Sequence, residues 1–585
     1  MLHSSYIPLP DAQEMRAWDA AATTFGLPEV LLMENAARAA LAVLEDCTGP
    51  VAGKRVWLVM GGGNNGGDAA CLARLLLDAE ALPLVIHTKV LRTLSGAAAR
   101  HVRWARKAGV PFIAAARHNW TDPAPTAPPQ TASALRAYAA DVPQAGDAWP
   151  DILVDGMLGT GFSGQLRADA LALVRRMNTL RHGTFLLALD VPSGLNAASG
   201  LPMPEAVRAH ATVTFEAAKP GLVLPQARPF TGRLYAPRIG IPRMVRQAHA
   251  PACYAVDAGC AVLLPPPACH TYKGSFGHVL VAGGAEGMSG AAHLAARAVL
   301  RAGGGLVTAA SPACTDVRFG LPDIMTLPLA PASEPASALA GAQAYPKPAL
   351  SPAPQPPPCG WPAPLPDALL SRMAACAALV IGPGMGRTAD GAAFLRALLH
   401  LPQRPAAVID ADALWHVAQD EQLAALLRPD DILTPHAGEA ARLLELSSAD
   451  VQQDRRAALS ALTTRFPCVC VLKGAGTLIS RRDAPHILAP FDAPNLALAG
   501  SGDVLAGCIG ALLAQGLDSL NAAALGVLLH AEAGLDLREA FPERGNLSSQ
   551  TADALPEARA RLRGTAGKPA LTKLFIHPHP YGSRT

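Results

Sequence analysis

The sequence lacks a marked excess of either charge, and it lacks the cysteine spacing of a zinc site. Its 585 residues include 49 lysines and arginines and 46 aspartates and glutamates, which leaves a net charge of +3. A chain so close to neutrality gives no reason to expect nucleic acid or an acidic surface as a partner. The eleven cysteines are scattered without a C-x-x-C pair or a histidine–cysteine cluster, which favours free thiols in a reducing cytoplasm.

Clear targeting and membrane-spanning segments are also missing. Residues 1–13 contain no basic segment followed by an apolar run, so we expect no signal peptide. The longest apolar stretch, residues 496–513, is interrupted by Asp503 and by glycines. It predicts a buried helix rather than a membrane span, so no membrane partner is expected. Half of the residues are hydrophobic and 16% are charged, which is typical of a globular protein, and the length predicts about two to four domains.

What the sequence does contain is a repeated alternation of strands and helices. In the first half, strands are expected at 55–60, 84–88, 152–155 and 185–190, with helices at 68–79 and 97–108. The pattern resumes with strands at 277–282, 306–310, 378–381, 406–409, 431–433 and 468–472. Such alternation predicts an α/β protein whose parallel sheets carry helices on both faces.

The alternation stops at places that divide the chain. A Pro-rich stretch around 242–267 separates an expected domain at 1–242 from a second at 243–562. Residues 114–150 and 328–368 are rich in alanine and proline and show little periodicity, so we interpret them as insertions. Residues 563–585 form a tail without a clear element.

A glycine-rich helix start lies near the C-terminal end. Gly500-Ser501-Gly502-Asp503 opens an apolar helix expected at 504–515. The small residues let the backbone approach a ligand, and the free N–H groups and dipole of the helix favour a phosphate there. Asp503 would repel that phosphate, so its presence indicates a general base that deprotonates a hydroxyl attacking phosphorus. An ordinary helix start with a helix-favouring charge explains the motif equally well.

A second glycine-rich loop follows the first expected strand of the chain. Gly61, Gly63 and Gly66 have the G-x-G-x-x-G spacing of dinucleotide sites. The acidic residue that such sites require at the end of the next strand is absent, because that strand ends in His87-Thr88-Lys89. An ordinary NAD dehydrogenase is therefore disfavoured. The side chains from Asn64 to Asp68 suit ribose hydroxyls, a carboxamide or a hard cation.

Two more polar loops follow strands of the same predicted sheet. One runs from Asp155 to Gly164, and the other is Asp190-Val191-Pro192-Ser193-Gly194. The carboxyl ends of parallel strands meet at one crevice, so Asn65, Asp155 and Ser193 are candidates to bind a monovalent or divalent cation through oxygen. Taken singly, each loop is explained by the preference of Asp, Ser and Gly for turns. Three such loops at successive strand ends favour the site.

These motifs resemble those of the NAD(P)H-hydrate epimerase domain. The resemblance spans roughly residues 10–242 apart from the insertion, and includes Leu32-Met33-Glu34-Asn35-Ala36 and Lys219-Pro220-Gly221-Leu222. It implies that Asp190 contacts the substrate as an acid or base and that Asn65, Asp155 and Ser193 bind K⁺. The other contacts to the hydrated nucleotide that it implies are Asn64, Asn65, Gly66, Gly67, Asp68, Gly159, Thr160, Gly161, Phe162, Ser163, Gly164 and Gln165.

The second half carries four further polar loops after expected strands. They are Gly382 to Gly386, Asp410 with Asp412, Thr434-Pro435-His436 with Glu439, and Lys473 to Thr477. Glycines with a lysine and a hydroxyl suit a nucleotide phosphate, and paired carboxylates suit metal or acid–base chemistry. Singly, each has a local explanation: Lys473 as a solvated hairpin charge, His436 as a helix cap and Asp412 as a helix N-cap.

As a set, these loops resemble the ADP- or ATP-dependent NAD(P)H-hydrate dehydratase domain, which has a ribokinase-like fold. The resemblance covers about 255–560 apart from the insertion, with Tyr272 and Asp323 departing from the family's histidine and glutamate. It implies that Ala291, Gly384, His436 and Asp503 contact the hydrate, and that Mg²⁺ bridges the phosphates of ADP. The residues implied to hold the adenine nucleotide are Lys473, Gly474, Ala475, Gly476, Thr477 and Gly502.

The two resemblances together predict a Rossmann-like three-layer domain followed by a ribokinase-like α/β domain. The expected function is repair of hydrated NADH and NADPH, by epimerising the R and S forms and dehydrating the S form with conversion of ADP to AMP and phosphate. The family tends to assemble, so a homo-oligomer is expected. The alternatives are a ribokinase-like small-molecule kinase, and a first domain that senses nucleotides or binds proteins without turnover.

Overall fold

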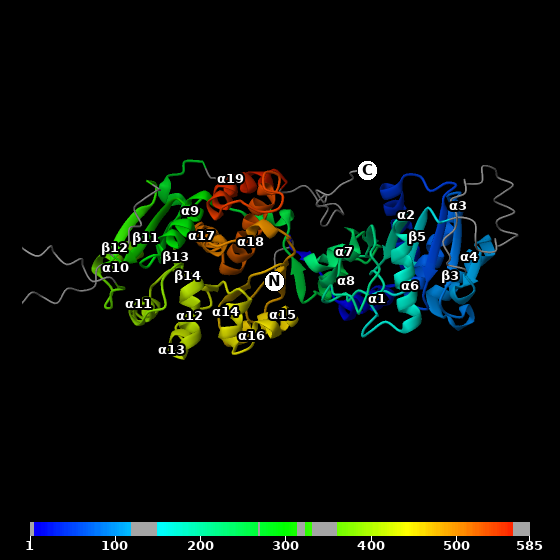
Figure 1. The fold of residues 1–585 in the computed structure, drawn as a ribbon, viewed down its shortest axis with the longest axis horizontal. Helices are drawn as coiled ribbons and strands as arrows, with labels where there is room; N and C mark the ends of the chain where they lie inside the picture. Colours follow the sequence, from blue (N-terminus) through cyan, green and yellow to red (C-terminus); the bar gives the residue numbers. More distant parts are fainter. Residues whose placement is uncertain (1–4, 119–148, 267–268, 313–321, 330–359, 566–585) are drawn as a thin grey trace, which may run out of the picture. The chain divides into compact units, whose positions relative to one another are not determined.

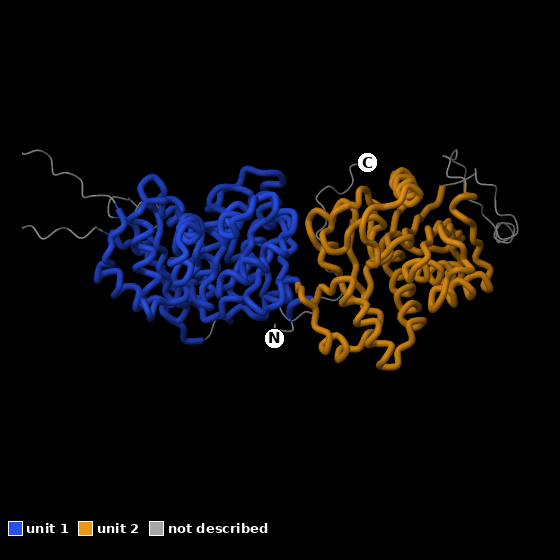
Figure 2. Tube along the Cα trace, turned by 90° about the horizontal axis from the view of Figure 1, so that it is seen from below, with its two compact units in different colours: residues 1–7, 255–568 blue, residues 8–254, 569–585 orange. Residues whose placement is uncertain are grey.

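The computed structural model describes residues 5–118, 149–266, 269–312, 322–329 and 360–565. Most of the two expected insertions and of the tail lies outside these residues. Figure 2 shows the two compact units of the chain. The N-terminal unit is the described part of Pro8–Tyr254, and the C-terminal unit is that of Ala255–Lys568 with the residues up to Ile7. Among the described helices, none combines the length and apolarity that crossing a membrane requires.

The N-terminal unit is built on a parallel seven-stranded sheet (Figure 1). Its order is β4 (Phe112–Ala114), β3 (Leu82–His87), β2 (Arg55–Met60), β5 (Ile152–Gly156), β6 (Phe185–Leu189), β7 (Ala211–Val213) and β8 (Arg233–Tyr235). From β2 the strand order continues outward through β3 to β4, and from β5 it continues outward on the other side through β6 and β7 to β8. The order along the chain therefore reverses between β2 and β5. Open α/β sheets bind ligands at the carboxyl end of such a reversal.

Alternating side chains of β2 fill both faces of this sheet. Val56, Leu58 and Met60 join one apolar core, whereas Val59 joins the other. The first core includes residues of α1 (Ala12–Phe25), α2 (Glu29–Thr48), α3 (Asn64–Asp78) and α4 (Gly96–Ala108), and the second includes α6 (Ala168–Leu180). A parallel sheet covered on both faces is the expected three-layer arrangement.

The helix expected at 68–79 begins earlier, because α3 starts at Asn64 directly after β2 and its loop. The two asparagines therefore belong to the first turn of a helix, not to a loop before it. The tight connection requires Gly61: a Cβ there would lie 1.8 Å from the carbonyl oxygen of Met157. Strands β7 and β8 were not predicted, since three residues each are too short to show a period.

The second sheet has eleven strands, of which seven are parallel and two form an antiparallel extension. These nine belong to the C-terminal unit, whereas β1 and β9 lie where the chain passes from one unit to the other. The strand order of this sheet is β1 (Ile7–Pro8), β9 (Cys253–Ala255), β18 (His486–Ala489), β17 (Thr477–Ser480), β16 (Val469–Leu472), β15 (Ile432–Leu433), β14 (Ala406–Ile409), β13 (Ala378–Ile381), β10 (His278–Ala282), β11 (Leu306–Pro312) and β12 (Met325–Leu329). The strands predicted at 378–381 and 406–409 are confirmed to the residue. The sequence did not indicate β12 or the hairpin of β17 and β18.

Helices cover both faces of this second sheet (Figure 1). On one face α9 (Ser289–Arg301), α17 (Ser501–Ala514), α18 (Ser519–Leu537) and α19 (Ser548–Thr565) pack together. The helix expected at 504–515 begins at Ser501, so Asp503 lies in its first turn. Helices α11 (Ala389–His400), α12 (Ala411–Gln419), α14 (Ala437–Leu444) and α16 (Arg455–Arg465) occupy the other face.

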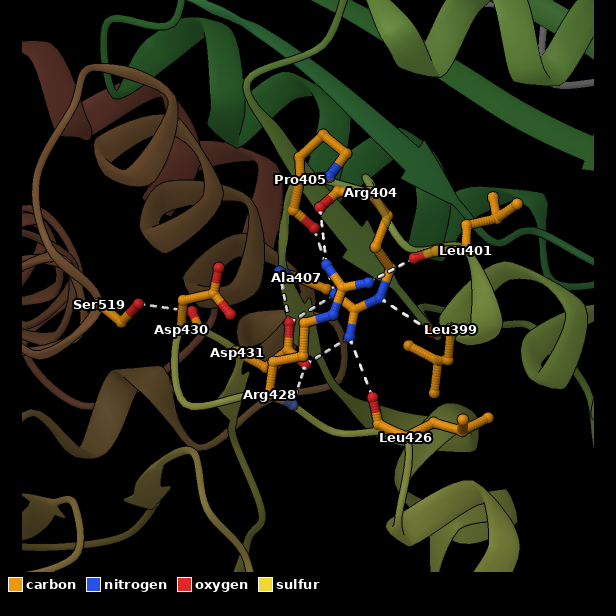
Figure 3. Close-up of polar contacts among 10 residues, drawn as sticks. All are labelled: Leu399, Leu401, Arg404, Pro405, Ala407, Leu426, Arg428, Asp430, Asp431 and Ser519. Atoms are coloured by element: carbon orange, nitrogen blue, oxygen red, sulfur yellow. Dashed lines mark hydrogen bonds and ion pairs between the residues drawn. The ribbon is translucent and has the colours of Figure 1, made fainter.

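A buried ion pair joins the loops that enter β14 and β15 (Figure 3). Arg404 donates to both oxygens of Asp431, at 2.7 and 2.6 Å, and both side chains are fully buried. Asp431 also accepts hydrogen bonds from the backbone N–H groups of Ala407 (3.0 Å) and Arg428 (2.8 Å). These contacts fix the amino ends of two strands whose carboxyl ends carry polar loops.

Candidate functional sites

A cavity of about 960 Å³ opens in the N-terminal unit at the carboxyl ends of β2 and β5. Helices α1 and α2 contribute part of its wall. The predicted site residues that line it are Asn64, Asn65, Asp68, Gly159, Thr160, Gly161, Phe162, Ser163 and Asp190. Gly66, Gly67, Gly164 and Gln165 are not among the lining residues. A Cβ at Gly66 would lie 2.2 Å from the carbonyl oxygen of Gly61, so this glycine serves the close packing of the loop.

The three predicted cation ligands lie together beside this cavity. Asp155 accepts hydrogen bonds from the hydroxyl (2.6 Å) and the backbone N–H (2.7 Å) of Ser193. Asn65 donates to the carbonyl oxygens of Leu158 (2.7 Å) and Leu189 (3.0 Å). Its own side-chain oxygen is buried and has no hydrogen-bond partner among the described residues.

The chemistry of this group fits a hard cation. Burial raises the pKa of Asp155 to about 6, against the hydrogen bonds from Ser193 and Met157 that favour its charged form. A nearby cation would stabilise the buried carboxylate and would satisfy the orphaned oxygen of Asn65. The ligand role itself stays a prediction.

Asp190 is held by a buried lysine. Its Oδ1 accepts from Lys219 Nζ at 2.7 Å, and its Oδ2 accepts from the backbone N–H of Thr160 at 3.1 Å. Lys219 is only 1% exposed and also donates to Thr214 Oγ1 (2.7 Å) and to the carbonyl oxygen of Phe215 (3.2 Å). The sequence placed Lys219 in a family motif but gave no sign of this contact, because the two residues are 29 positions apart.

A second polar cluster lies between α2, α3 and α4, where the sequence had indicated no metal-like grouping. Glu34, Cys71 and His101 bring their ligand atoms within 4.8 Å of one another. Arg74 donates at 2.6 Å to the Glu34 oxygen that also accepts from Cys71. The guanidinium supplies the positive charge at this point, so the cluster is explained as a protein ion-pair network.

In the C-terminal unit, four polar loops meet at the carboxyl edge of the sheet. Gly382 follows β13, Asp410 follows β14, Thr434 follows β15 and Lys473 follows β16. Lys473 Nζ donates to Asp410 Oδ1 at 2.6 Å, and the Thr434 hydroxyl donates to the same oxygen at 2.8 Å. The local explanation of Lys473 as a solvated hairpin charge is wrong, since its side chain is largely buried in an ion pair.

The N-terminus of α17 faces this lysine. Gly500 caps the helix with φ of 85°, a conformation that favours glycine. A Cβ at Gly502 would lie 3.4 Å from Lys473 Nζ and 3.6 Å from Asp410 Oδ2. Burial opposes the charge of Lys473, but Asp410 and Glu439 raise its pKa above the ordinary value, so it stays a cation. Free N–H groups and a positive charge suit a phosphate, so we call this arrangement the phosphate cradle, and nucleotide binding there stays a prediction.

Asp503 has an unusually basic carboxyl in this cradle. Burial is the main cause, and the negative charge of Asp410 adds to it; together they raise its pKa to about 7 against the opposing effect of Lys473. A general base is most effective when its pKa lies near the working pH. A free aspartate has a pKa of about 4, so the environment of Asp503 favours a more basic carboxyl than usual, and its role as a base stays a prediction.

The predicted hydrate contacts Gly384 and Ala291 are neighbours. A Cβ at Gly384 would lie 3.0 Å from that of Ala291. The loop of Gly384 is fixed at its far end, because Gly386 donates its N–H to Asp412 (3.0 Å) and its carbonyl oxygen lies 2.9 Å from His416 Nε2. Asp410 and Asp412 thus bond different partners, Lys473 and Gly386.

Two further predicted residues have local structural roles. His436 is the N-cap of α14, where its Nδ1 accepts from the N–H of Gly438 at 3.0 Å. Nε2 therefore carries the proton, and burial and the charge of Lys473 lower the pKa of the ring. Thr477 donates to the carbonyl oxygen of Gly474 at 2.9 Å and closes the hairpin that follows Lys473. His436 Nε2 lies 3.4 Å from Glu439 Oε1, and the ligand contacts of both residues stay predictions.

Trp361 belongs to the core, although the sequence placed it in the insertion at 328–368. It is 4% exposed, and its ring centroid lies 4.6 Å from that of Phe394. Its Nε1 donates to the carbonyl oxygen of Met385 at 2.8 Å. Trp361, which composition alone assigned to an insertion, therefore supports the Gly384 loop through this hydrogen bond.

The fold and the two sites define an α/β enzyme of two units, each with polar loops at the carboxyl edge of its sheet. Comparison with known proteins agrees. Residues 29–221 match the family model described as YjeF-related protein N-terminus, and residues 279–557 match NAD(P)H-hydrate dehydratase.

Relatives of full length place the chain more closely. A bifunctional NAD(P)H-hydrate repair enzyme from Moorella thermoacetica is 34% identical over 94% of this chain and 96% of its own length. One from Coxiella burnetii is 33% identical over 94% and 98%. Among solved structures, the chain is similar to a ribokinase-like superfamily protein from Enterococcus faecalis. The match covers 53% of this chain and 96% of that protein, at 21% identity and a TM-score of 0.43. The chain belongs to the family of bifunctional NAD(P)H-hydrate repair enzymes.

Proposed function

We propose that the N-terminal unit interconverts the R and S epimers of hydrated NADH and NADPH, and that the C-terminal unit dehydrates the S epimer while ADP becomes AMP and phosphate. Membership of the repair family supports both activities. The observation that carries the dehydratase assignment is Asp503, a carboxyl whose pKa is raised to about 7 at the mouth of a phosphate cradle.

The substrate has added water across a double bond of the dihydronicotinamide ring, which leaves a hydroxyl on the carbon next to the ring nitrogen. Hydroxide is a poor leaving group, and phosphorylation converts it into a good one. Asp503 accepts the hydroxyl proton as that oxygen attacks the terminal phosphorus of ADP. The N–H groups of α17 and the Lys473 ammonium stabilise the charge on phosphorus. The nitrogen lone pair then expels phosphate, and loss of a neighbouring proton restores the ring.

In the N-terminal unit, Asp190 is the acid–base group. Lys219 and Thr160 fix its two carboxylate oxygens and hold it at the cavity wall. Opening the hydroxyl-bearing carbon to an aldehyde and closing it again on the other face inverts that centre. The dehydratase accepts one epimer, so an epimerase on the same chain keeps the other from accumulating.

Two cations complete the proposal. Asn65, Asp155 and Ser193 would hold K⁺, which supplies fixed positive charge beside the substrate. Mg²⁺ would accompany the phosphates of ADP, as hard cations do in phosphoryl transfer. Neither ion replaces a proton-transfer group of the chain.

The test combines purified chain, hydrated NADH and ADP, and follows the absorbance of NADH together with AMP release. We expect one AMP for each NADH regained. Phosphorylated product without NADH would establish the small-molecule kinase instead. Separation of the epimers in the absence of ADP tests the N-terminal unit. Their failure to interconvert would leave it as a module without turnover.

The matched variants are Asp503→Asn and Asp483→Asn. Both remove one carboxylate, but Asp483 is exposed in the turn between β17 and β18, where its φ of 58° is accessible to asparagine. Asp503→Asn is expected to abolish NADH recovery and to leave ADP binding largely intact, whereas Asp483→Asn recovers NADH at the parental rate. Normal recovery by Asp503→Asn would refute the role of this residue as base.

A further inference from the structure

Two carboxyls that line the N-terminal cavity have no hydrogen-bond or ion-pair partner among the described residues. Asp68 of α3 and Asp19 of α1 line the same cavity as Asp190. Asp68 is only 8% exposed, yet neither its carboxyl nor that of Asp19 makes a hydrogen bond or an ion pair with a described residue. The side-chain oxygens of neither residue are among the buried polar atoms that have no partner, so both carboxyls open onto the cavity, where a ligand or a reaction can use them.

Asp190 differs from these two carboxyls because it has a positively charged partner. The ammonium of Lys219 is already held by Asp190 at 2.7 Å. Burial raises the pKa of Asp68 well above its ordinary value; the charges of Asp190, Asp19 and Glu29 raise it further, and Lys219 opposes them.

Asp19 is less strongly affected. Burial raises its pKa to about 6, opposed by Lys219 and assisted by Asp190, Glu29 and Glu216. Burial and the surrounding carboxylates therefore favour the protonated form at both positions.

We infer that Asp68 is the proton donor of the epimerase reaction and that Asp19, which lines the same cavity, acts on it through its charge. The inference rests on the proposed epimerase function and adds the acid that Asp190 alone does not provide. Asp190, which is ion-paired with the Lys219 ammonium, takes the role of base.

The proposed step balances without any further reactant. The substrate hydroxyl gives its proton to the Asp190 carboxylate, and a C=O bond forms at the ring carbon. The bond from that carbon to the ring nitrogen breaks, and its electron pair stays on nitrogen, which takes the proton of Asp68. Rotation about the adjacent carbon–carbon bond presents the other face of the aldehyde. The nitrogen then attacks, its proton returns to Asp68, and the oxygen recovers its proton from Asp190.

The first test uses the full chain with the purified R epimer of hydrated NADH and no ADP, with the epimers separated by chromatography. Asp68→Asn is expected to lower kcat for epimerisation by about 10²- to 10⁴-fold with little change in KM. Asp78→Asn is the control, since this residue ends the same helix and its side chain is 63% exposed. Dehydration of the S epimer with ADP reports that the variant chain is folded. A rate for Asp68→Asn within twofold of the parent would overturn the inference.

The second test uses the pH profile and remains informative if Asp68→Asn does not fold. The acid must be protonated, so kcat for epimerisation falls as the pH rises through the pKa of Asp68. Asp19→Asn removes a negative charge, lowers that pKa and moves the falling limb to lower pH, while Asp19→Glu leaves it near its parental position. An unmoved limb in Asp19→Asn would refute the role of Asp19. Absence of epimerisation by the parent chain would instead refute the proposed function.

Discussion

At the scale of single residues, Asp503 links burial to pH dependence. Its pKa is raised to about 7, chiefly by burial and then by Asp410. The base must be deprotonated, so kcat/KM for dehydration should fall about tenfold for each pH unit below 7 and level off above it. The measurement is kcat/KM for the S epimer at saturating ADP across this range. If kcat/KM instead began to fall only near pH 4, a carboxyl with an ordinary pKa would control the rate, and the prediction for Asp503 would be wrong.

Lys219 is a positioning residue for Asp190 in the other unit. Lys219→Met removes the only ammonium that bonds Asp190 among the described residues. We expect kcat for epimerisation to fall at least about tenfold because the carboxylate loses its orientation, with KM changing less. Dehydration of the S epimer in the same chain should be unaffected. An equal loss of both activities would indicate misfolding rather than lost orientation.

At the scale of elements, the Arg404–Asp431 pair ties together the strands that carry the dehydratase loops. Removing one partner leaves a buried charge, so Asp431→Ala should destabilise the C-terminal unit by about 3–5 kcal/mol. The readout is the denaturant midpoint at which dehydratase activity is lost. The matched control is Arg396→Ala, which breaks the pair with Asp420 through an arginine side chain that is 50% exposed and leaves Asp420 as a helix N-cap, and its effect should stay below about 1 kcal/mol. A midpoint unchanged in Asp431→Ala would mean that the pair does not fix these strands.

At the scale of the whole molecule, two units with separate chemistry should respond to separate ions. Replacing K⁺ by Li⁺ is expected to slow epimerisation and to spare dehydration, because Li⁺ is too small for ligands spaced for K⁺. Chelation of Mg²⁺ should do the reverse. Asp155→Asn should make epimerisation insensitive to the choice of monovalent ion. If both activities followed the same ion, the assignment of one cation to each unit would fail.

Sequence reasoning reached the fold class and most strands because buried parallel strands are short apolar runs flanked by glycines and polar residues. The motifs around Asn65, Asp155 and Asp503 were also found from sequence, since each lies within a few residues of a strand end. Strands β7 and β8 and the start of α3 were missed. In these places the backbone follows contacts with distant residues, such as Gly61 against Met157, and not local periodicity.

By itself, the sequence determined which chemical groups stand at the strand ends and the order in which they follow along the chain. Only the tertiary structure decided the electrostatics: that Lys219 bonds Asp190, that Lys473 bonds Asp410, and that Asp503 becomes a base near neutral pH. The physical reason is that a pKa depends on burial and on charges within a few ångströms. Those neighbours come from residues far apart in the chain.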